Sequence, residues 1–374
     1  MTTYHYAAAC LFGLEKFVGE EIDACGGTRT QTIDGRVYFD GDETVLAGAN
    51  LNLRTAERVY IELGRFPAPT FAALFDGVKE IPWEMFIGKN DAFPVKGHSV
   101  HSALTSIPDC QSIIKKAIVE RIKLSYRTDW FEETGTKYQI VFFILNDEAS
   151  ILLDTSGLPL YKRGYRLESG EAPIRETLAA ALVKTARPRE DVRLWDPFCG
   201  SGTIALEAAL LMTNTAPGLY RHFAAEQYGF LDKSIWKNAR NEALAALTPK
   251  TEFRANASDI DAKVLETAKA NIKRARMEKY INVFQKDALT ITKDDVRTTI
   301  VGNPPYGERM DTIREARELY RKLGKVFPQL SPWQIYLITS EEDFESLYGV
   351  KADKVRKLYN GMIPCRLYQY FKRK

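Results

Sequence analysis

The chain has 374 residues, of which 45% are hydrophobic and 27% are charged, and its formal net charge is +3. This length allows two or three domains with cores of their own. No apolar run approaches the ~18 residues of a membrane helix, and Met1 to Tyr6 lack the pattern of a signal peptide. Five scattered cysteines without a Cys-x-x-Cys pair argue against disulfides and zinc, so we expect a cytoplasmic protein without a metal site.

The first 65 residues alternate helical and strand patterns. Helices are predicted over 14–25 and 43–50, and strands over 35–40 and 58–63. This rhythm is typical of a small ferredoxin-like α+β unit.

The block that follows mixes the two patterns again. Its predicted elements are two helical turns over 71–87 that Pro82 interrupts, a strand over 92–95, a helix over 113–126, and strands over 138–145 and 149–154. The helix over 113–126 would bury Ile114, Ile118 and Ile122 on one face. Asn146 and Asp147 are expected to form the turn between the last two strands.

The rest of the chain alternates strands and helices, which predicts a largely parallel sheet. Strands are predicted over 192–195, 253–257, 281–285, 299–301, 334–339, 355–358 and 366–371. Helices are predicted after Pro173, with Ile174, Leu178 and Leu182 on the apolar face, and over 204–212 and 313–327. An insertion over 214–247 carries Phe223, Tyr228, Phe230 and Trp236, which we expect to be core residues.

A Gly-rich turn follows the first of these strands, in the sequence Asp196-Pro197-Phe198-Cys199-Gly200-Ser201-Gly202-Thr203. Glycines at a strand-to-helix corner let the backbone approach a ligand closely. The full dinucleotide fingerprint and the phosphate-loop Lys are both missing, so neither of those functions is supported. Cys199 lies in this turn, and we interpret it as a small packing residue and not as a nucleophile.

Polar residues end the next three strands. Asp259-Ile260-Asp261 could accept the hydroxyls of a ribose, Asp287-Ala288 ends the following strand, and Asn303-Pro304-Pro305-Tyr306 ends the fourth. An Asn oxygen and the next carbonyl can each accept one N–H of an exocyclic amine, and Tyr306 offers a face on which a base can stack. We expect all four signals to meet in one crevice at the carboxyl edge of the sheet.

Positive charge is unevenly distributed along the chain. Residues 1–165 carry 17 Lys and Arg against 22 Asp and Glu, whereas residues 166–374 carry 35 against 27. Two basic stretches, 111–128 and 351–374, predict phosphate contacts. The candidate RNA-binding residues are Lys115, Lys116, Arg121, Lys372, Arg373 and Lys374.

Together these motifs resemble the class I S-adenosylmethionine-dependent RNA methyltransferases that carry a THUMP domain. Lys162-Arg163-Gly164-Tyr165-Arg166 and the segment 172–180 extend the resemblance, and Asn303 to Arg309 is similar to the bacterial 23S rRNA guanine-N2 methyltransferases. The resemblance implies a Rossmann-like seven-stranded α/β sheet with an antiparallel last strand. It further implies a ferredoxin-like subdomain over 1–65, a THUMP domain over 66–157 and a methyltransferase domain over 158–374.

The resemblance also implies roles for individual residues. Asn303, Pro304, Pro305 and Tyr306 would be catalytic. Those expected to hold S-adenosylmethionine are Asp196, Phe198, Gly200, Gly202, Thr203, Asp259, Asp261, Asp287, Ala288 and Asn303, with Asp259 ahead of Asp261 as the ribose acceptor. The expected partner is RNA, most specifically 23S rRNA or a pre-ribosomal particle.

Three alternatives stay open at this point. Asn-Pro-Pro-Tyr serves adenine N6 equally well, on DNA or RNA. Release-factor glutamine methylation uses the same motif, although the THUMP-like block argues against it. The chain could also be a non-catalytic RNA-binding protein with a degenerate methyltransferase domain.

Overall fold

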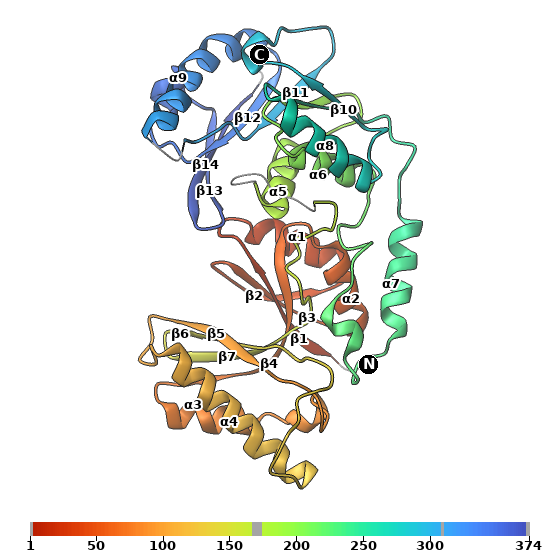
Figure 1. Cartoon of the computed structure of the whole chain (residues 1–374), viewed down its shortest axis with the longest axis vertical. Helices are drawn as coiled ribbons and strands as arrows, with labels where there is room; N and C mark the ends of the chain where they lie inside the picture. The colour runs from red at the N-terminus through yellow and green to blue at the C-terminus, as the bar shows by residue number, and fades with distance from the viewer. Residues whose placement is uncertain (1–2, 167–173, 308–309, 372–374) are drawn as a thin grey trace.

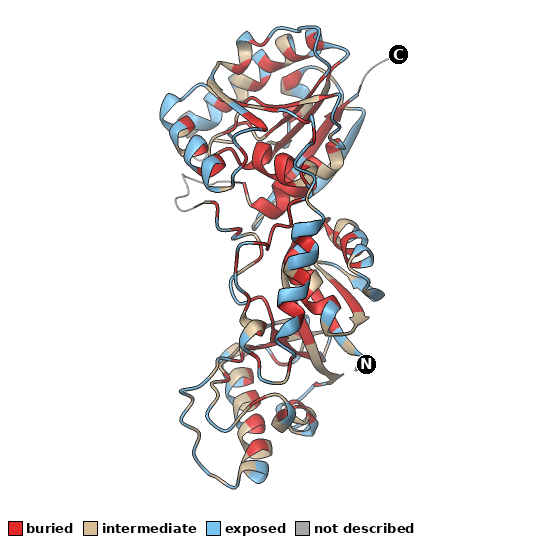
Figure 2. Ribbon diagram, turned by 90° about the vertical axis from the view of Figure 1, so that its right-hand side faces the viewer, coloured by how far each residue is buried: buried red, intermediate tan, exposed pale blue. Residues whose placement is uncertain are grey.

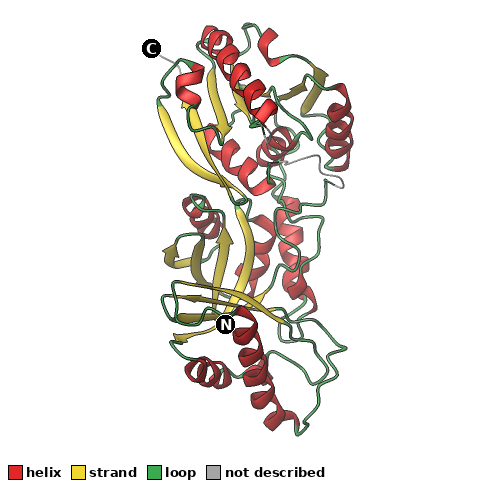
Figure 3. Cartoon of the chain, turned by 60° about the vertical axis from the view of Figure 1, so that its left-hand side comes forward, coloured by secondary structure: helices red, strands yellow, loops and turns green. Residues whose placement is uncertain are grey.

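The computed structural model describes residues 3–166, 174–307 and 310–371. The chain forms an elongated molecule in which two seven-stranded sheets follow one another along the long axis (Figure 1, Figure 3). The strand order is β2-β3-β1-β4-β7-β6-β5 in the amino-terminal sheet and β10-β9-β8-β11-β12-β14-β13 in the carboxyl-terminal sheet. In the part of the chain that the structure describes, no helix is both long and apolar enough to cross a membrane.

The amino-terminal sheet begins with the predicted ferredoxin-like unit. Its elements are β1 (Tyr4–Cys10), α1 (Glu15–Ala24), β2 (Thr28–Ile33), β3 (Arg36–Gly41), α2 (Glu43–Asn52) and β4 (Ala56–Pro67). We did not predict β1 or β2. Strand β1 buries Tyr6, Ala7 and Ala8 in succession, so its sequence does not alternate, whereas β2 is an exposed edge strand without an apolar face.

The same sheet continues into the THUMP-like block. Its elements are α3 (Phe71–Glu80), the short helix η1 (Trp83–Met85), β5 (Val95–Val100), α4 (Ile107–Tyr126), β6 (Ile140–Leu145) and β7 (Glu148–Asp154). Strand β4 pairs with both β1 and β7, so residue 65, where we placed a domain boundary, lies inside a shared strand.

Two predicted elements of this block need correction, and two are confirmed. The strand predicted over 92–95 begins only at Val95, because Pro94 has no N–H for the ladder, and Ala92 makes a single bridge to Lys137. Helix α4 begins six residues earlier than predicted, with Ser106 as its N-cap. The buried face of Ile114, Ile118 and Ile122 is confirmed, as is the turn at Asn146-Asp147.

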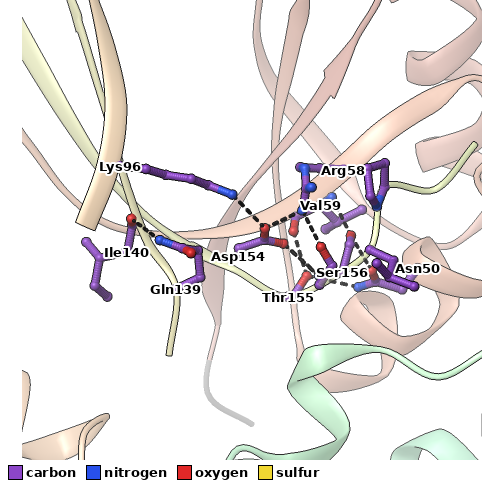
Figure 4. Close-up of polar contacts among 12 residues, drawn as sticks. Asn50, Arg58, Val59, Lys96, Gln139, Ile140, Asp154, Thr155 and Ser156 are labelled. Carbon is purple, nitrogen blue, oxygen red and sulfur yellow. Dashed lines mark hydrogen bonds and ion pairs between the residues drawn. The ribbon is translucent and has the colours of Figure 1, made fainter. Parts of the chain in front are cut away.

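A buried polar junction fixes the chain where it leaves this sheet (Figure 4). Asp154, at the end of β7, contacts the guanidinium of Arg58 and lies 3.8 Å from Lys96 Nζ. One Asp154 oxygen also accepts the N–H of Ser156 at 3.1 Å, and the Ser156 hydroxyl is 2.7 Å from Asn50 Oδ1. These contacts join three strands and α2 to the segment that leads into the second domain.

The carboxyl-terminal sheet has the predicted Rossmann-like topology. Its strands are β8 (Arg193–Asp196), β9 (Ala255–Asp259), β10 (Ile281–Gln285), β11 (Thr298–Gly302), β12 (Gln334–Thr339), β13 (Lys354–Asn360) and β14 (Ile363–Tyr370). The last strand, β14, is antiparallel and lies between β12 and β13, which confirms the expected antiparallel last strand.

Helices cover both faces of this sheet and turn their buried sides toward it (Figure 2). They are α5 (Glu176–Ala186), α6 (Thr203–Met212), α8 (Ala262–Arg274), α9 (Met310–Val326) and α10 (Phe344–Tyr348), with the short helices η3 (Ala288–Thr290) and η4 (Phe327–Leu330). Helices α5, α6 and α8 share one core, and α9 lies over the other. Ile174, Leu178 and Leu182 are buried as predicted, whereas Pro173 lies outside the described residues.

The insertion after α6 does not belong to this sheet. It contains η2 (Ala224–Gln227) and α7 (Ser234–Ala245), and α7 packs against α2 of the amino-terminal region (Figure 1). Phe223, Tyr228 and Trp236 are buried as expected, but in the amino-terminal core, where the ring of Tyr228 stacks 4.4 Å from that of Tyr138. The second domain therefore supplies part of the core of the first.

Charged contacts complete the connection between the two halves. Glu21 of α1 accepts a hydrogen bond from Lys184 of α5 at 2.7 Å, and Glu57 of β4 accepts one from Arg175 at 2.7 Å. These pairs are partly buried, so each depends on its partner for compensation of lost hydration.

Candidate active site at the carboxyl ends of the strands

Strands β8, β9, β10 and β11 end at the same edge of the sheet, where a cavity of about 960 Å³ opens. This position, outside the carboxyl ends of parallel strands, is where ligands bind in open α/β sheets. Most of the predicted residues line the cavity, namely Asp196, Phe198, Gly200, Thr203, Asp259, Asp287, Ala288, Asn303, Pro304, Pro305 and Tyr306. Gly202 and Asp261 do not.

The Gly-rich turn needs its glycines for two different reasons. Gly202 has a φ of +83°, and a Cβ there would lie 3.3 Å from the Cβ of Ala268, so Gly202 lets α6 start close to α8. Gly200 has a φ of +48°, and a Cβ there would meet nothing within 4 Å. The space in front of Gly200 is thus open toward the cavity, which leaves room for a ligand.

Asp259 organises this turn as well as lining the cavity. Its Oδ2 accepts the N–H of Gly200 at 3.0 Å, and its Oδ1 accepts the N–H of Asp261 at 3.1 Å. The Asp261 carboxylate instead accepts the N–H of Lys263 and caps α8. This difference supports Asp259 over Asp261 as the acceptor for a bound hydroxyl.

Asp196 is the most buried carboxylate of the cavity, with 1% of its surface exposed. It accepts one hydrogen bond from the N–H of Phe198 at 3.1 Å. Burial, with a smaller contribution from the charge of Asp259, raises the pKa of Asp196 to about 8. A carboxylate that is this costly to ionise would gain most from a cationic ligand.

Asp287 lies at the start of η3, and Ala288 behind it is buried. One Asp287 oxygen accepts the N–H of Leu289 at 2.9 Å, which fixes the side chain at the rim of the cavity.

The Asn303 to Tyr306 loop is held from two sides. The Tyr320 hydroxyl of α9 donates to the carbonyl of Pro305 at 2.7 Å. The Tyr306 hydroxyl donates to Asn303 Oδ1, and the Cys365 thiol of β14 lies 3.9 Å from the same hydroxyl. Burial raises the pKa of Tyr306, which therefore stays a neutral donor. Asn303 Oδ1 is the oxygen that we expect to accept a hydrogen bond from the substrate amine, and here it already accepts one from Tyr306. When the amine binds, the Tyr306–Asn303 hydrogen bond must therefore break, or Oδ1 must accept both.

The sequence did not reveal three residues that support this site. Arg166 donates to the Thr203 hydroxyl and to the carbonyl of Ile174, Tyr320 holds the Pro305 carbonyl, and Cys365 contacts Tyr306. Arg166 lies in a segment that already carried the family resemblance. Tyr320 and Cys365 gave no signal: Tyr320 lies on α9, the helix after the loop, where the sequence does not show that its hydroxyl turns back to Pro305, and Cys365 reaches the loop from β14, which is distant in sequence.

The predicted RNA-binding residues do not gather at this site. Lys115 contacts Glu133 at 2.5 Å and lies 3.6 Å from the centre of the Phe93 ring, and Arg121 pairs with Glu84 at 2.8 Å. Lys116 is exposed on α4. Lys372, Arg373 and Lys374 lie outside the described residues. The charge of Lys115 and Arg121 is thus largely neutralised within the protein.

Three family models match the chain. Residues 5–60 match the RlmL ferredoxin-like domain, residues 68–154 match the THUMP domain, and residues 163–369 match the RMKL-like methyltransferase domain.

Comparison with individual proteins also finds methyltransferases similar to this chain. The chain is 43% identical over 373 residues to the "Putative RNA methyltransferase YpsC" of Bacillus subtilis (strain 168), covering 99% of this chain and 97% of that protein. It is 30% identical to the "Ribosomal RNA large subunit methyltransferase K/L" of Shewanella baltica (strain OS155), but it spans about half the length of that protein, 52%, with 96% of this chain aligned. The crystal structure of SMU.472 complexed with SAH is 36% identical with a TM-score of 0.93, covering 100% of this chain and 99% of that one.

Proposed function

Because the chain belongs to the RMKL-like methyltransferase family and carries a THUMP domain, we propose that it transfers a methyl group from S-adenosylmethionine to guanine N2 of 23S rRNA. The observation that carries the proposal is the position of two features in one cavity. A buried carboxylate, Asp196, and the acceptor loop at Asn303-Pro304 both line it.

The residues at the cavity fit this cofactor. The open space in front of Gly200 and the raised pKa of Asp196 favour a cationic ligand close to the Gly-rich turn. In the proposed arrangement, Asp196 faces the amino end of the methionine portion, Asp259 accepts the ribose hydroxyls and Asp287 receives the adenine amine. When bound, the cofactor supplies an electrophilic methyl group.

The chain then has to present an amine in line with that methyl group. Asn303 Oδ1 and the carbonyl of Pro304 accept the two N–H groups of the base, so the nitrogen lone pair is directed into the cavity. The same oxygens stabilise the positive charge that the nitrogen gains as its new bond forms. The methylated ammonium is acidic enough to lose its proton without a dedicated base. Tyr306 would stack on the base once it has been unstacked from its helix.

Nucleoside mass spectrometry of rRNA tests the proposal. A strain that lacks the gene should lose N2-methylguanosine at a single position of 23S rRNA, the wild-type gene should restore it, and Asn303→Ala should not. Asp261→Asn is the matched control, because Asp261 caps α8 and lies outside the cavity. Loss of N6-methyladenosine instead would refute the assignment to guanine, and intact rRNA modification would refute the assignment to 23S rRNA.

A further inference from the structure

A second cavity, of about 730 Å³, lies at the opposite end of the same strands. It is bounded by α1 of the ferredoxin-like unit, by the end of α5, and by the beginnings of β11, β12 and β13 with the end of β14. We call it the basic groove. Four of its lining residues, Lys354, Arg356, Gln369 and Phe371, belong to the basic stretch 351–374 for which phosphate contacts were predicted, but none of the lining residues was among the candidate RNA-binding residues.

The charge of the basic groove is strongly one-sided. Seven Lys and Arg side chains line it, against the single carboxylate of Glu20. Lys184 is paired with Glu21, and two of the arginines reach Asp191, so three carboxylates face seven cations. Among the described residues, Arg187 and Lys354 have no carboxylate partner, and both are exposed. The groove therefore has an excess of positive charge that a polyanion would neutralise.

An unsatisfied amide points to a ligand independently of the charge. Gln369 of β14 lines the groove and is only 3% exposed, yet its Nε2 has no hydrogen-bond partner. A buried donor without a partner lowers stability, and native proteins rarely leave one without a reason. An acceptor oxygen of a bound molecule would satisfy it.

Aromatic rings complete the lining. Phe17 of α1 lies under the cations of Arg356 and Lys184, at 4.8 Å and 5.4 Å from its ring centre. Phe371, at the rim, is 38% exposed and packs edge-on against Tyr336. Cations that follow a groove, together with a ring available for stacking, are the combination that single-stranded nucleic acid requires.

We propose that the basic groove binds a single-stranded segment of the substrate RNA that flanks the methylated nucleotide. The proposal rests on the proposed function, since it assigns a second contact surface to the same substrate. Thr299 of β11 lines the groove, and Asn303, directly after the end of β11, lines the active site; the two are four residues apart, or about 13 Å at 3.3 Å per residue. At about 3.4 Å per stacked nucleotide, the segment would lie at least four nucleotides from the target base.

Salt-dependent binding by the full-length protein tests the proposal. The probes are rRNA from the deletion strain and a short fluorescent single-stranded RNA of mixed sequence. The double variant Arg187→Gln/Lys354→Gln should bind both more weakly, and the slope of log K against log salt should fall by about 1.4, since each phosphate contact on single strands contributes about 0.7. The matched control is Lys322→Gln/Lys325→Gln, two exposed cations on α9 over the other face of the sheet.

Gln369→Leu separates a binding role from a structural one. Because the Nε2 of Gln369 has no partner within the protein, the variant should unfold at the temperature of the wild type or at a higher one, while its RNA affinity falls about fivefold, the effect of one lost hydrogen bond. Cofactor affinity should not change in any of these variants.

The outcomes distinguish this proposal from the proposed function. If the wild type binds and methylates rRNA and the groove variants behave like the α9 control, the groove assignment is wrong and the function stands. If the wild type binds neither RNA, both fail. If inorganic phosphate binding depends on Gln369 and Arg187 while RNA binding does not, the groove serves a small anion and the proposal is wrong.

Discussion

The affinity for S-adenosylmethionine should depend on pH through Asp196. This carboxylate is buried, and its pKa is raised to about 8, so it is mostly protonated in the free protein at neutral pH. A cationic ligand requires the ionised form, and each pH unit below 8 adds about 1.4 kcal/mol to the free energy of ionising it. Between pH 5.5 and 7.5 the dissociation constant should therefore fall by roughly tenfold per pH unit. An α-amino group ordinarily has a pKa of about 7.7–8.0, so the ligand itself stays protonated over most of this range.

Isothermal titration calorimetry in buffers of different ionisation enthalpy measures both the affinity and the proton released on binding. Asp196→Asn should bind more weakly at pH 7.5, show no pH slope and release no proton. Asp261→Asn, which alters an exposed helix cap, should keep the wild-type slope. A flat wild-type profile, or the same slope in Asp196→Asn, would show that Asp196 does not meet the positive charge of the cofactor.

Ionisation of Asp196, which should favour cofactor binding, should lower the stability of the cofactor-free protein. A carboxyl whose folded pKa is raised above its ordinary value of 3.8 stabilises the fold at low pH, and this contribution is lost as the pH rises toward 8. Asp196→Asn keeps an oxygen for the Phe198 N–H but cannot ionise. Without cofactor, the variant should thus unfold at a higher temperature than the wild type at pH 8, and the difference should disappear near pH 4. Thermal unfolding at both pH values measures it.

Three further outcomes follow from the contacts around the site. Asp259→Ala removes the acceptor for two backbone N–H groups as well as the proposed ribose contact, so calorimetry should show a loss in cofactor affinity of about 1.5–3 kcal/mol for each charged hydrogen bond, and unchanged affinity would remove Asp259 from the site. If Tyr306 acts by stacking, Tyr306→Phe should keep the single-turnover rate and Tyr306→Ala should lower it by about tenfold or more; equal rates for both variants would contradict this role. A chain that starts at Leu158 should methylate RNA poorly, and, because the insertion loses its core partners, it should also unfold at a lower temperature than the full chain in calorimetry; full activity would contradict the role of the amino-terminal half.

The sequence predicted the catalytic sheet better than the amino-terminal one. A polar signal ends or follows each of the four strands β8, β9, β10 and β11, so Asp196, Asp259, Asp287 and Asn303 could be placed on one edge before their distances were known. Strand β1 gave no alternating pattern because both of its faces are buried.

Contacts between distant segments were the part that the sequence could not provide. Nothing in the stretch around Phe223 and Trp236 indicates that these rings pack against α2 instead of the adjoining sheet. The pairing of Lys115 with Glu133 was equally hidden, and it weakens a basic stretch that looked suited to phosphates. The basic groove was hidden for the same reason, since its cations come from α1, from α5 and the segment after it, from the residue before β11 and from β13.

The ion pair between Lys184 and Glu21 joins the two domains next to the basic groove. Removing Lys184 and Glu21 from water costs free energy that an apolar contact would not, so the pair is weak support for stability alone. It does fix α1 opposite the end of α5, and α1 supplies Lys16, Phe17 and Glu20 to the basic groove. If the groove holds RNA, the docking of the amino-terminal domain forms one wall of it. Glu21→Gln leaves all seven groove cations in the sequence but removes the carboxylate that holds Lys184 and α1 in place. It should then weaken RNA binding in the same salt-dependent assay, while cofactor affinity at the far end of the strands stays unchanged.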